Sequence, residues 1–405
     1  MSQFAPILTG FTPIRLADPT PQGMSLEISA YAFAKSQFRK REHEDGVEFS
    51  SVYKDVRQKF LNYALPQDVI KRRQLVFFPK LSDIKFDNGQ FSLNEPEHDY
   101  LKLFDNYEDL TPKDIKARHG SYAKVVGDCL DEMYSGVDEA PDDLIHVTCS
   151  GYLAPSPVER MVSRREWFNT TVTHSYHMGC YGAFPAIKMA HGFLSSSRFS
   201  VTPPKDRVDI VHSELLSAHC DTAELKAENI ITMTLFADGF IKYSVVDEEW
   251  INQRGQPGLK ILAFNEHLLP NSADDMTWVP GSTRFHMTLS VMVPVIIKQS
   301  VRPFVENLFR RINLDYEQER ERLMFAIHPG GPKIVEHIQE SLGLTDDQVA
   351  ISRSIFVENG NMSSATVPHI LKEILEEPSI TRGTRVVCLG FGPGLTATGL
   401  IVEKV

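Results

Sequence analysis

Apolar residues follow two different spacings along the chain. Runs in which they are continuous, or alternate with polar residues, predict β-strands. These runs occupy residues 144–151, 207–217, 230–246 and 385–405. Stretches in which they recur every three or four positions predict amphipathic helices. These stretches occupy residues 115–134, 332–344 and 364–377. Strands that alternate with helices in this way predict an α/β fold class.

The length of the chain predicts more than one structural unit. A chain of 405 residues exceeds what one small hydrophobic core usually organises. Residues 265–284 show little periodicity and separate two β-rich parts. We place the division near residue 247, which gives an N-terminal half (residues 1–247) and a C-terminal half (residues 248–405).

Composition and charge narrow the classes of function. Apolar residues make up 42% of the chain and charged residues 23%, which is typical of a globular protein. The formal net charge of -11 argues against extended contact with nucleic acid, which requires a basic face. No window has the length and apolar character of a membrane span, and the first residues lack the pattern of a secretory leader. A cytoplasmic location is therefore expected.

The cysteines are few and scattered. The chain has Cys129, Cys149, Cys180, Cys220 and Cys388, with no CxxC pair. This pattern predicts neither a disulfide framework nor a zinc site, and it fits a reducing compartment. In such a compartment a single cysteine is most often a small buried apolar residue.

Cys180 has a local sequence that also permits a catalytic part. It lies between Gly179 and Gly182, and Pro185 follows at a position typical of the first turn of a helix. A helix N-terminus favours a thiolate, and flanking glycines allow close approach of an acyl group. The sequence therefore leaves open whether Cys180 is a nucleophile or a structural residue. The HxxHxxC spacing of His174, His177 and Cys180 would not bring three metal ligands together on a helix or a strand, so no metal is expected.

Two further polar residues stand at predicted strand-to-helix switches, where open α/β sheets build their sites. His328 ends an apolar run and precedes a Pro-Gly-Gly-Pro turn, and Asn361 precedes a turn of small residues and another helix. Taken alone, each is more often a turn or capping residue. A glycine-rich segment with Gly390, Gly392 and Gly394 joins two apolar strands near residue 405, which predicts backbone packed tightly around a cavity.

Four motifs in this order resemble those of the thiolase superfamily, and most specifically the type III polyketide synthases that are similar to chalcone synthase. The motifs are GCYGA around Cys180, IHPGG at His328, ENGNMSSAT around Asn361 and the terminal GFGPGLT. The resemblance covers roughly residues 60–405, and the chain is a divergent member. It implies a five-layered αβαβα fold made of two similar halves, and a homodimer.

The resemblance also implies roles for individual residues. Cys180 would be the acylated nucleophile, and His328 and Asn361 would be the decarboxylation pair, with His328 as an imidazolium that keeps Cys180 ionised. The acyl cavity would be gated by Phe236 and Phe285, and the phosphates of coenzyme A would be bound by Lys71, Arg72 and Arg73. The chain departs from plant enzymes in the cavity lining, at Leu216 and His219, and at the subunit contact, at Ala154.

The implied reaction loads an acyl starter, carried by coenzyme A or an acyl carrier protein, onto Cys180. Decarboxylative Claisen condensation with malonyl-CoA then extends it, with or without closure to a pyrone or resorcinol ring, and no bound cofactor is required. The alternatives are a single-round β-ketoacyl synthase, a non-decarboxylating thiolase or acyltransferase, and a catalytically silent partner subunit. Asn361 in place of a histidine favours decarboxylation, and Cys388, at the place of a second thiolase cysteine, is interpreted as structural.

Overall fold

The computed structural model describes residues 5–41, 43–78, 84–87, 90–93, 114–199 and 203–405. Within these residues one sheet has nine strands, in the order β13-β14-β15-β10-β1-β9-β8-β6-β7. The strands are β1 (Ile7–Ile14), β6 (Asp143–Thr148), β7 (Thr171–Tyr176), β8 (Arg207–Glu214), β9 (Gly239–Val246), β10 (Leu259–Leu268), β13 (Met324–Ile327), β14 (Arg385–Gly392) and β15 (Thr396–Lys404). The pairs β13–β14, β6–β7 and β6–β8 are parallel, and the other neighbours are antiparallel.

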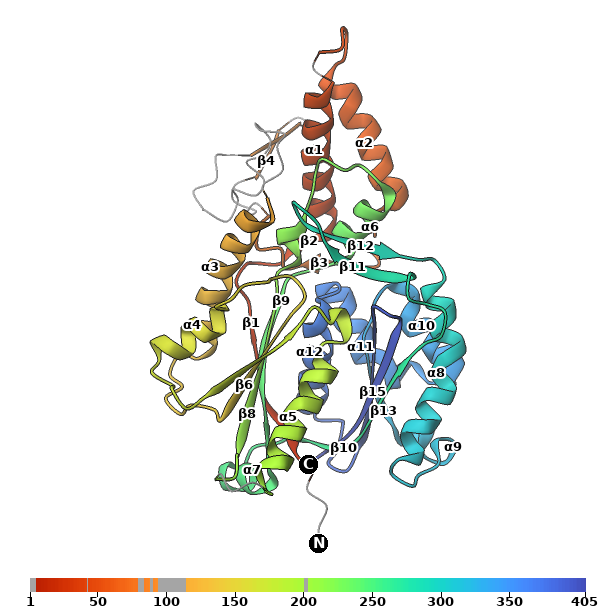
Figure 1. The fold of residues 1–405 in the computed structure, drawn as a ribbon. Helices are drawn as coiled ribbons and strands as arrows, with labels where there is room; N and C mark the ends of the chain where they lie inside the picture. The colour runs from red at the N-terminus through yellow and green to blue at the C-terminus, as the bar shows by residue number, and fades with distance from the viewer. Residues whose placement is uncertain (1–4, 42, 79–83, 88–89, 94–113, 200–202) are drawn as a thin grey trace.

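One part of the sheet contains β1, β6, β7, β8 and β9, and the other part contains β10, β13, β14 and β15. Helices cover the outer faces of both parts and also lie between them (Figure 1). Helices α3 (Ile115–Met133) and α4 (Pro157–Arg164) lie outside β1, β6, β8 and β9, and α8 (Val293–Arg310) and α10 (Pro332–Leu342) lie outside β10, β13, β14 and β15. Helices α5 (Ala183–Ser197) and α12 (Thr366–Glu376) occupy the middle. This α-β-α-β-α order confirms the expected fold class.

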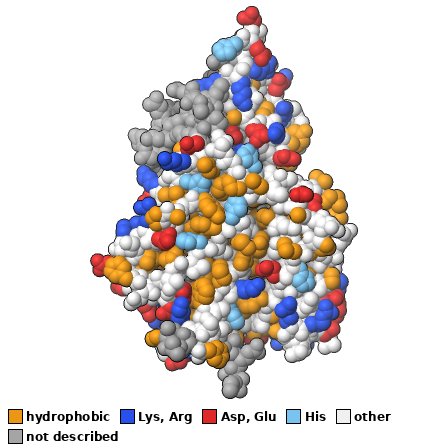
Figure 2. All heavy atoms as spheres, in the orientation of Figure 1, with side chains coloured by type: hydrophobic (Ala, Val, Ile, Leu, Met, Phe, Trp, Pro, Cys, Tyr) orange, Lys and Arg blue, Asp and Glu red, His pale blue; other side chains and the backbone are white. Residues whose placement is uncertain are grey.

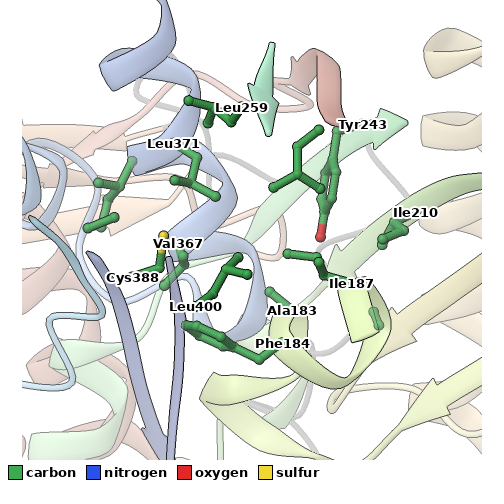
Figure 3. Close-up of a cluster of buried hydrophobic side chains, with 14 of the residues drawn as sticks. Ala183, Phe184, Ile187, Ile210, Tyr243, Leu259, Val367, Leu371, Cys388 and Leu400 are labelled. Atoms are coloured by element: carbon green, nitrogen blue, oxygen red, sulfur yellow. The ribbon is translucent and has the colours of Figure 1, made fainter. Parts of the chain in front are cut away.

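The core between the two parts of the sheet is apolar and closely packed. Side chains of α5, α12 and strands on both sides meet there (Figure 3). The buried residues of α12 recur at helical spacing, as Val367, Ile370, Leu371 and Ile374, so one stripe of the helix faces this core. Cys388 lies in the same core, is fully buried and does not line the cavities described below, so its structural interpretation fits its surroundings.

The structure describes further helices and short strands besides these. They are β2 (Thr20–Pro21), α1 (Gln22–Lys40), α2 (Phe49–Tyr63), β3 (Arg72–Arg73), β4 (Ile84–Asp87), β5 (Gln90–Leu93), α6 (Ala227–Leu235), α7 (Glu248–Arg254), β11 (Met276–Pro280), β12 (Phe285–Leu289), α9 (Tyr316–Glu319) and α11 (Asp346–Asn359). Within the described residues there are also four single turns of 3-10 helix: Gly179–Tyr181, Leu216–His219, Arg320–Arg322 and Ser363–Ala365. Helices α1 and α2 pack together at one end of the molecule (Figure 1).

The sequence-based prediction for residues 230–246 is wrong in part. Residues 230–246 were expected to be one strand, but α6 occupies their first part and β9 their last. The buried residues Ile230, Met233 and Thr234 lie on one face of α6. Between α6 and β9, the side chain of Asp238 accepts hydrogen bonds from the backbone N–H groups of Val76 and Ser217. Residues 265–284, whose sequence shows little periodicity, contain the end of β10 and all of β11. The proposed division at residue 247 falls between β9 and α7 and stays a prediction.

The surface is mixed, with a notable apolar component. Hydrophobic side chains gather across the middle of the face shown in Figure 2, and charged side chains lie mostly towards its edges. Exposed large apolar residues of the described chain include Tyr152, Phe168, Leu268, Val279 and Val291. Among the described helices, none is long and apolar enough to cross a lipid bilayer.

Candidate active site

A channel of about 460 Å³ brings together the three residues that the sequence singled out first. Cys180, His328 and Asn361 all line it, although they come from three distant parts of the chain. Most of the other lining side chains are aliphatic, aromatic or methionine, and they include Leu65, Ile231, Leu235, Phe236, Met276, Met287, Leu289, Val293, Ile297, Ile334 and Phe391. The thiol, the imidazole and the amide of these residues therefore lie on one channel whose lining is otherwise largely apolar.

Cys180 occupies the turn that leads into α5. It lies in the 3-10 turn Gly179–Tyr181, directly before the helix, and only 7% of its surface is exposed. Gly179 has a φ of 69°, and a β-carbon there would come within 2.8 Å of Cδ of Pro393. The glycine before the cysteine is thus required by backbone conformation and by space, and it holds the thiol at the start of the helix.

Asn361 presents its amide nitrogen to the thiol. Its Oδ1 accepts a hydrogen bond from the backbone N–H of Ser363 at 2.8 Å, which assigns the orientation of the amide. Nδ2 then lies 4.0 Å from Sγ of Cys180 and 3.5 Å from the carbonyl oxygen of Gly330. The backbone of Asn361 also pairs with the backbone of Phe236 in an isolated parallel β-bridge. This pairing fixes the backbone of two residues that line the channel.

His328 follows the last residue of β13. Its backbone N–H donates to the carbonyl oxygen of Leu389 at 2.8 Å, which continues the pairing with β14. The side chain is buried, and neither ring nitrogen has a hydrogen-bond partner within the described part of the chain. A buried polar group without a partner is costly, so these nitrogens are available to a bound molecule.

Burial opposes a charge on either partner of this pair. It raises the pKa of the Cys180 thiol to about 12, although hydrogen bonds from Ser363 and Asn361 act in the opposite direction. It lowers the pKa of His328 to about 3. The expected imidazolium at His328 stays a prediction, because burial favours the neutral ring when His328 is considered alone. Transfer of the thiol proton to the imidazole leaves the net charge of the channel unchanged, so the two groups ionise most easily as a pair.

A second, much smaller cavity lies beside the channel, and we call it the inner pocket. It has a volume of about 30 Å³, and Phe236 lines both cavities. Phe285, Leu216 and His219 line the inner pocket and not the channel. Of the two expected gate residues, the structure thus places only Phe236 beside the proposed nucleophile. Ala154 is exposed and lines neither cavity, so its part in a subunit contact stays a prediction.

The basic run requires a correction. The guanidinium of Arg73 is fully buried and donates to Oε1 of Gln22, Oγ of Ser25 and the carbonyl oxygens of Met233 and Phe236. Arg73 therefore cannot reach a phosphate in solvent, and its assignment to coenzyme A is wrong.

Its two neighbours in the run are already paired. Lys71 and Arg72 both form ion pairs with Glu358, at 2.8 and 3.0 Å, and neither lines the channel. Among the described residues, the lysine that lines the channel is Lys333, on the first turn of α10, and the sequence alone did not indicate it.

The terminal glycines have a different function from the one expected. A β-carbon at Gly390 would come within 2.4 Å of the ring of Phe184, and one at Gly392 within 2.3 Å of the ring of Tyr181. These two glycines therefore seat the aromatic rings that flank the start of α5 and are not walls of the channel. Gly394 has a φ of 128°, a conformation that favours glycine, in the turn between β14 and β15.

The buried carboxyl group of Glu214, near Cys180, was also missed by the sequence-based predictions. Oε2 of Glu214, at the end of β8, accepts hydrogen bonds from the backbone N–H and the thiol of Cys149 at 2.9 and 3.3 Å. Sγ of Cys149 is in turn 3.0 Å from Oγ of Ser363. Burial raises the pKa of Glu214. The available signal was an acidic residue at the end of an apolar strand, where an unpaired charge is unusual.

No group of three or more His, Cys, Asp or Glu side chains within the described residues is arranged to hold a metal ion.

The chain is similar in sequence and in structure to several known proteins. Residues 261–405 match the family described as chalcone and stilbene synthases, C-terminal domain. The 1,3,6,8-tetrahydroxynaphthalene synthase of Streptomyces coelicolor is 27% identical over 257 residues, which are 63% of this chain and 64% of that protein. The chain is thus similar to type III polyketide synthases. This finding confirms the resemblance inferred from the motifs.

The chain is also similar to two other curated proteins and to solved structures. The 1,3,6,8-tetrahydroxynaphthalene synthase of Streptomyces griseus is 24% identical over 63% of this chain and 65% of its own length. The match to probable polyketide synthase 1 of Dictyostelium discoideum, 23% identical, covers 79% of this chain but 10% of that protein. These matches thus span less than two thirds of the curated relatives. Among solved structures, PKS-I of the brown alga Ectocarpus siliculosus superposes with a TM-score of 0.78 at 18% identity, covering both chains completely, which shows a common fold.

Proposed function

We propose that the protein is a condensing acyltransferase that extends an acyl starter with malonyl-CoA by decarboxylative Claisen condensation. The observation that carries the proposal is the convergence of Cys180, His328 and Asn361 on one apolar channel. A nucleophile, a proton acceptor and an amide donor are the groups that this reaction requires. Coenzyme A thioesters are the proposed substrates.

Loading of the starter uses the ionised pair. As Sγ of Cys180 attacks the thioester carbonyl, the thiol proton passes to the imidazole of His328. A new C–S bond forms, the bond to the sulfur of coenzyme A breaks, and the departing thiolate takes the proton from His328. The site returns to its neutral state with an acyl group on Cys180, which is the state that burial favours.

Extension uses the same polar groups as hydrogen-bond donors. The malonyl carboxylate leaves as carbon dioxide, and its bonding electrons form an enolate on the thioester oxygen. In this proposal a ring N–H of His328 and Nδ2 of Asn361, which both line the channel, donate hydrogen bonds to that oxygen. The enolate carbon then attacks the acyl group on Cys180, which releases the sulfur and yields a β-ketoacyl thioester of coenzyme A.

Lys333 supplies a positive charge that an anionic carrier needs. It is exposed and is the one Lys or Arg among the described residues that line the channel. It also lies at the N-terminal end of α10, where the helix dipole adds partial positive charge. We propose that Lys333 contacts the phosphates of coenzyme A, in the place that the sequence analysis gave to residues 71–73.

The proposal extends to assembly and location. Exposed apolar side chains such as Tyr152, close in sequence to Ala154, favour self-association, and we propose a homodimer. A cytoplasmic location is also proposed, as is closure of the product to a pyrone or resorcinol. Delivery of the starter by an acyl carrier protein remains part of the proposal beside delivery by coenzyme A.

The purified protein, incubated with 14C-labelled malonyl-CoA and a panel of acyl-CoA starters, tests this function. We expect release of carbon dioxide and β-ketoacyl-derived products by mass spectrometry, and an acyl adduct on Cys180 by intact mass. Cys180→Ala should lose the adduct and the products, whereas Cys388→Ala should keep both. An acyl adduct retained in Cys180→Ala would contradict the assignment, and condensation without release of carbon dioxide would indicate a thiolase instead.

A further inference from the structure

The inner pocket is nearly filled by three aromatic side chains. His219 and Phe285 are stacked, with ring centroids 4.6 Å apart and an interplanar angle of 17°. Trp278 packs edge-on against both, with centroid distances of 5.6 Å to each. All three side chains are buried, at 9% exposure or less. The remaining volume of about 30 Å³ holds only one or two water molecules.

Hydrogen bonds fix this aromatic cluster in place. The indole Nε1–H of Trp278 donates to the carbonyl oxygen of Cys149 at 2.6 Å, and Nε2 of His177 lies 2.7 Å from the carbonyl oxygen of Trp278. Nε2 of His219 donates to the carbonyl oxygen of Ser150 at 2.8 Å, which leaves Nδ1 to accept from the backbone N–H of Phe285. Each polar ring atom of Trp278 and His219 is thus satisfied, and the rings lack freedom to move aside.

The channel offers the space that the inner pocket lacks. It is more than ten times larger, it contains the proposed nucleophile, and its lining is dominated by aliphatic and methionine side chains. Such a lining complements a flexible alkyl chain and has few polar groups to orient anything else. An acyl group on Cys180 therefore has the channel, and not the inner pocket, in which to lie.

We propose that Trp278 is a specificity-determining residue, an inference that rests on the proposed condensing function. With His219 and Phe285 it closes the inner pocket, so that the protein takes linear aliphatic acyl starters and excludes bulky aromatic ones. The same closure limits the number of malonyl units added, because an intermediate that folds back behind Phe236 finds no space. Removal of the indole opens that space.

The test compares starters of both shapes in matched variants. Wild type, Trp278→Ala and Trp250→Ala are assayed with hexanoyl-CoA, decanoyl-CoA and benzoyl-CoA, and product masses are recorded. Trp250 is a suitable control because its ring packs against the guanidinium of Arg254 and lines neither cavity. Wild type should prefer the aliphatic starters by roughly tenfold or more in kcat/KM, the scale of discrimination by an apolar pocket. Trp278→Ala should accept benzoyl-CoA and yield products with at least one more malonyl unit.

Two further measurements separate specificity from a loss of folding. Trp278→Phe, which keeps an aromatic ring, should retain the wild-type preference, and added indole should return Trp278→Ala towards the wild-type product masses. Unchanged starter preference and product masses in an active Trp278→Ala would overturn the inference while leaving the condensing function intact. Absence of condensation by wild type with every starter would instead remove the proposed function.

Discussion

Cys180 and His328 share a channel in which neither side chain bears a charge easily on its own. Burial raises the pKa of the thiol and lowers that of the imidazole. Each shift favours the neutral form, so at pH 7 a lone Cys180 is a thiol and a lone His328 is uncharged. In the proposed reaction the attacking thiolate therefore arises by proton transfer within the pair, and Asn361 contributes a hydrogen bond without accepting the proton.

Alkylation of Cys180 across pH therefore distinguishes the two partners. In His328→Ala the thiol must ionise alone, so the midpoint of iodoacetamide inactivation should move to higher pH and the rate at pH 7 should fall roughly tenfold or more, since one pKa unit changes the thiolate fraction tenfold. Asn361→Ala should leave the profile nearly unchanged. Both variants should nevertheless lose about 100-fold or more in decarboxylation of malonyl-CoA, the scale of one missing oxyanion donor. Equal shifts of the two alkylation profiles would show that His328 has no special part in ionising the thiol.

These three residues could be recognised from the sequence because each has a local signal. A glycine precedes Cys180, and turn residues follow His328 and Asn361, so neighbours in sequence determine where each side chain lies. The filling of the inner pocket had no such signal. Trp278 reaches the carbonyl oxygen of Cys149, 129 positions away, and this contact exists only after the hairpin of β11 and β12 packs against the sheet.

Among the elements, α10 links the site to the solvent. Its first turn carries Lys333 at the channel and its buried face, with Ile334 and Ile338, packs into the core. The periodicity of this helix was predicted correctly, but the direction in which Lys333 points follows from how the helix is docked. By contrast, α6 was mistaken for a strand because its β-branched residues favour strands, and burial of one helical face overrides that preference.

The position of Lys333 predicts an effect limited to substrates that carry phosphates. Lys333→Ala should raise KM for malonyl-CoA roughly three- to tenfold, as expected for loss of about 1 kcal/mol from an exposed ionic contact, with kcat unchanged. The N-acetylcysteamine thioester of malonate, which lacks the phosphates, should be used equally well by both proteins. Lys298→Ala, which removes a lysine that is paired with Glu340 away from the channel, is the matched control. An equal loss with both thioesters would indicate a structural part for Lys333.

At the scale of the whole molecule, Arg73 connects the N-terminal helices to the site. It donates to Gln22 and Ser25 of α1 on one side and to the carbonyl oxygens of Met233 and Phe236 on the other. Burial lowers the pKa of the guanidinium to about 10, so it remains protonated at pH 7. The sequence could not indicate this, because the partners lie 48 or more positions away and a run of three basic residues is usually exposed.

Stability measurements on neighbouring arginines test whether Arg73 serves the structure or the substrate. Arg73→Ala leaves several buried acceptors without a donor, so it should lower the free energy of unfolding by about 3 kcal/mol or more, seen as a lower midpoint in urea. Arg72→Ala removes an exposed ion pair with Glu358 and should cost less than about 1 kcal/mol. Because Arg73 also holds the backbone of Phe236, its loss should reduce condensation with coenzyme A and N-acetylcysteamine thioesters alike. If Arg73→Ala instead matched wild type in stability and raised KM only for coenzyme A thioesters, Arg73 would bind the carrier after all, and the buried network would not be what holds these helices to the site.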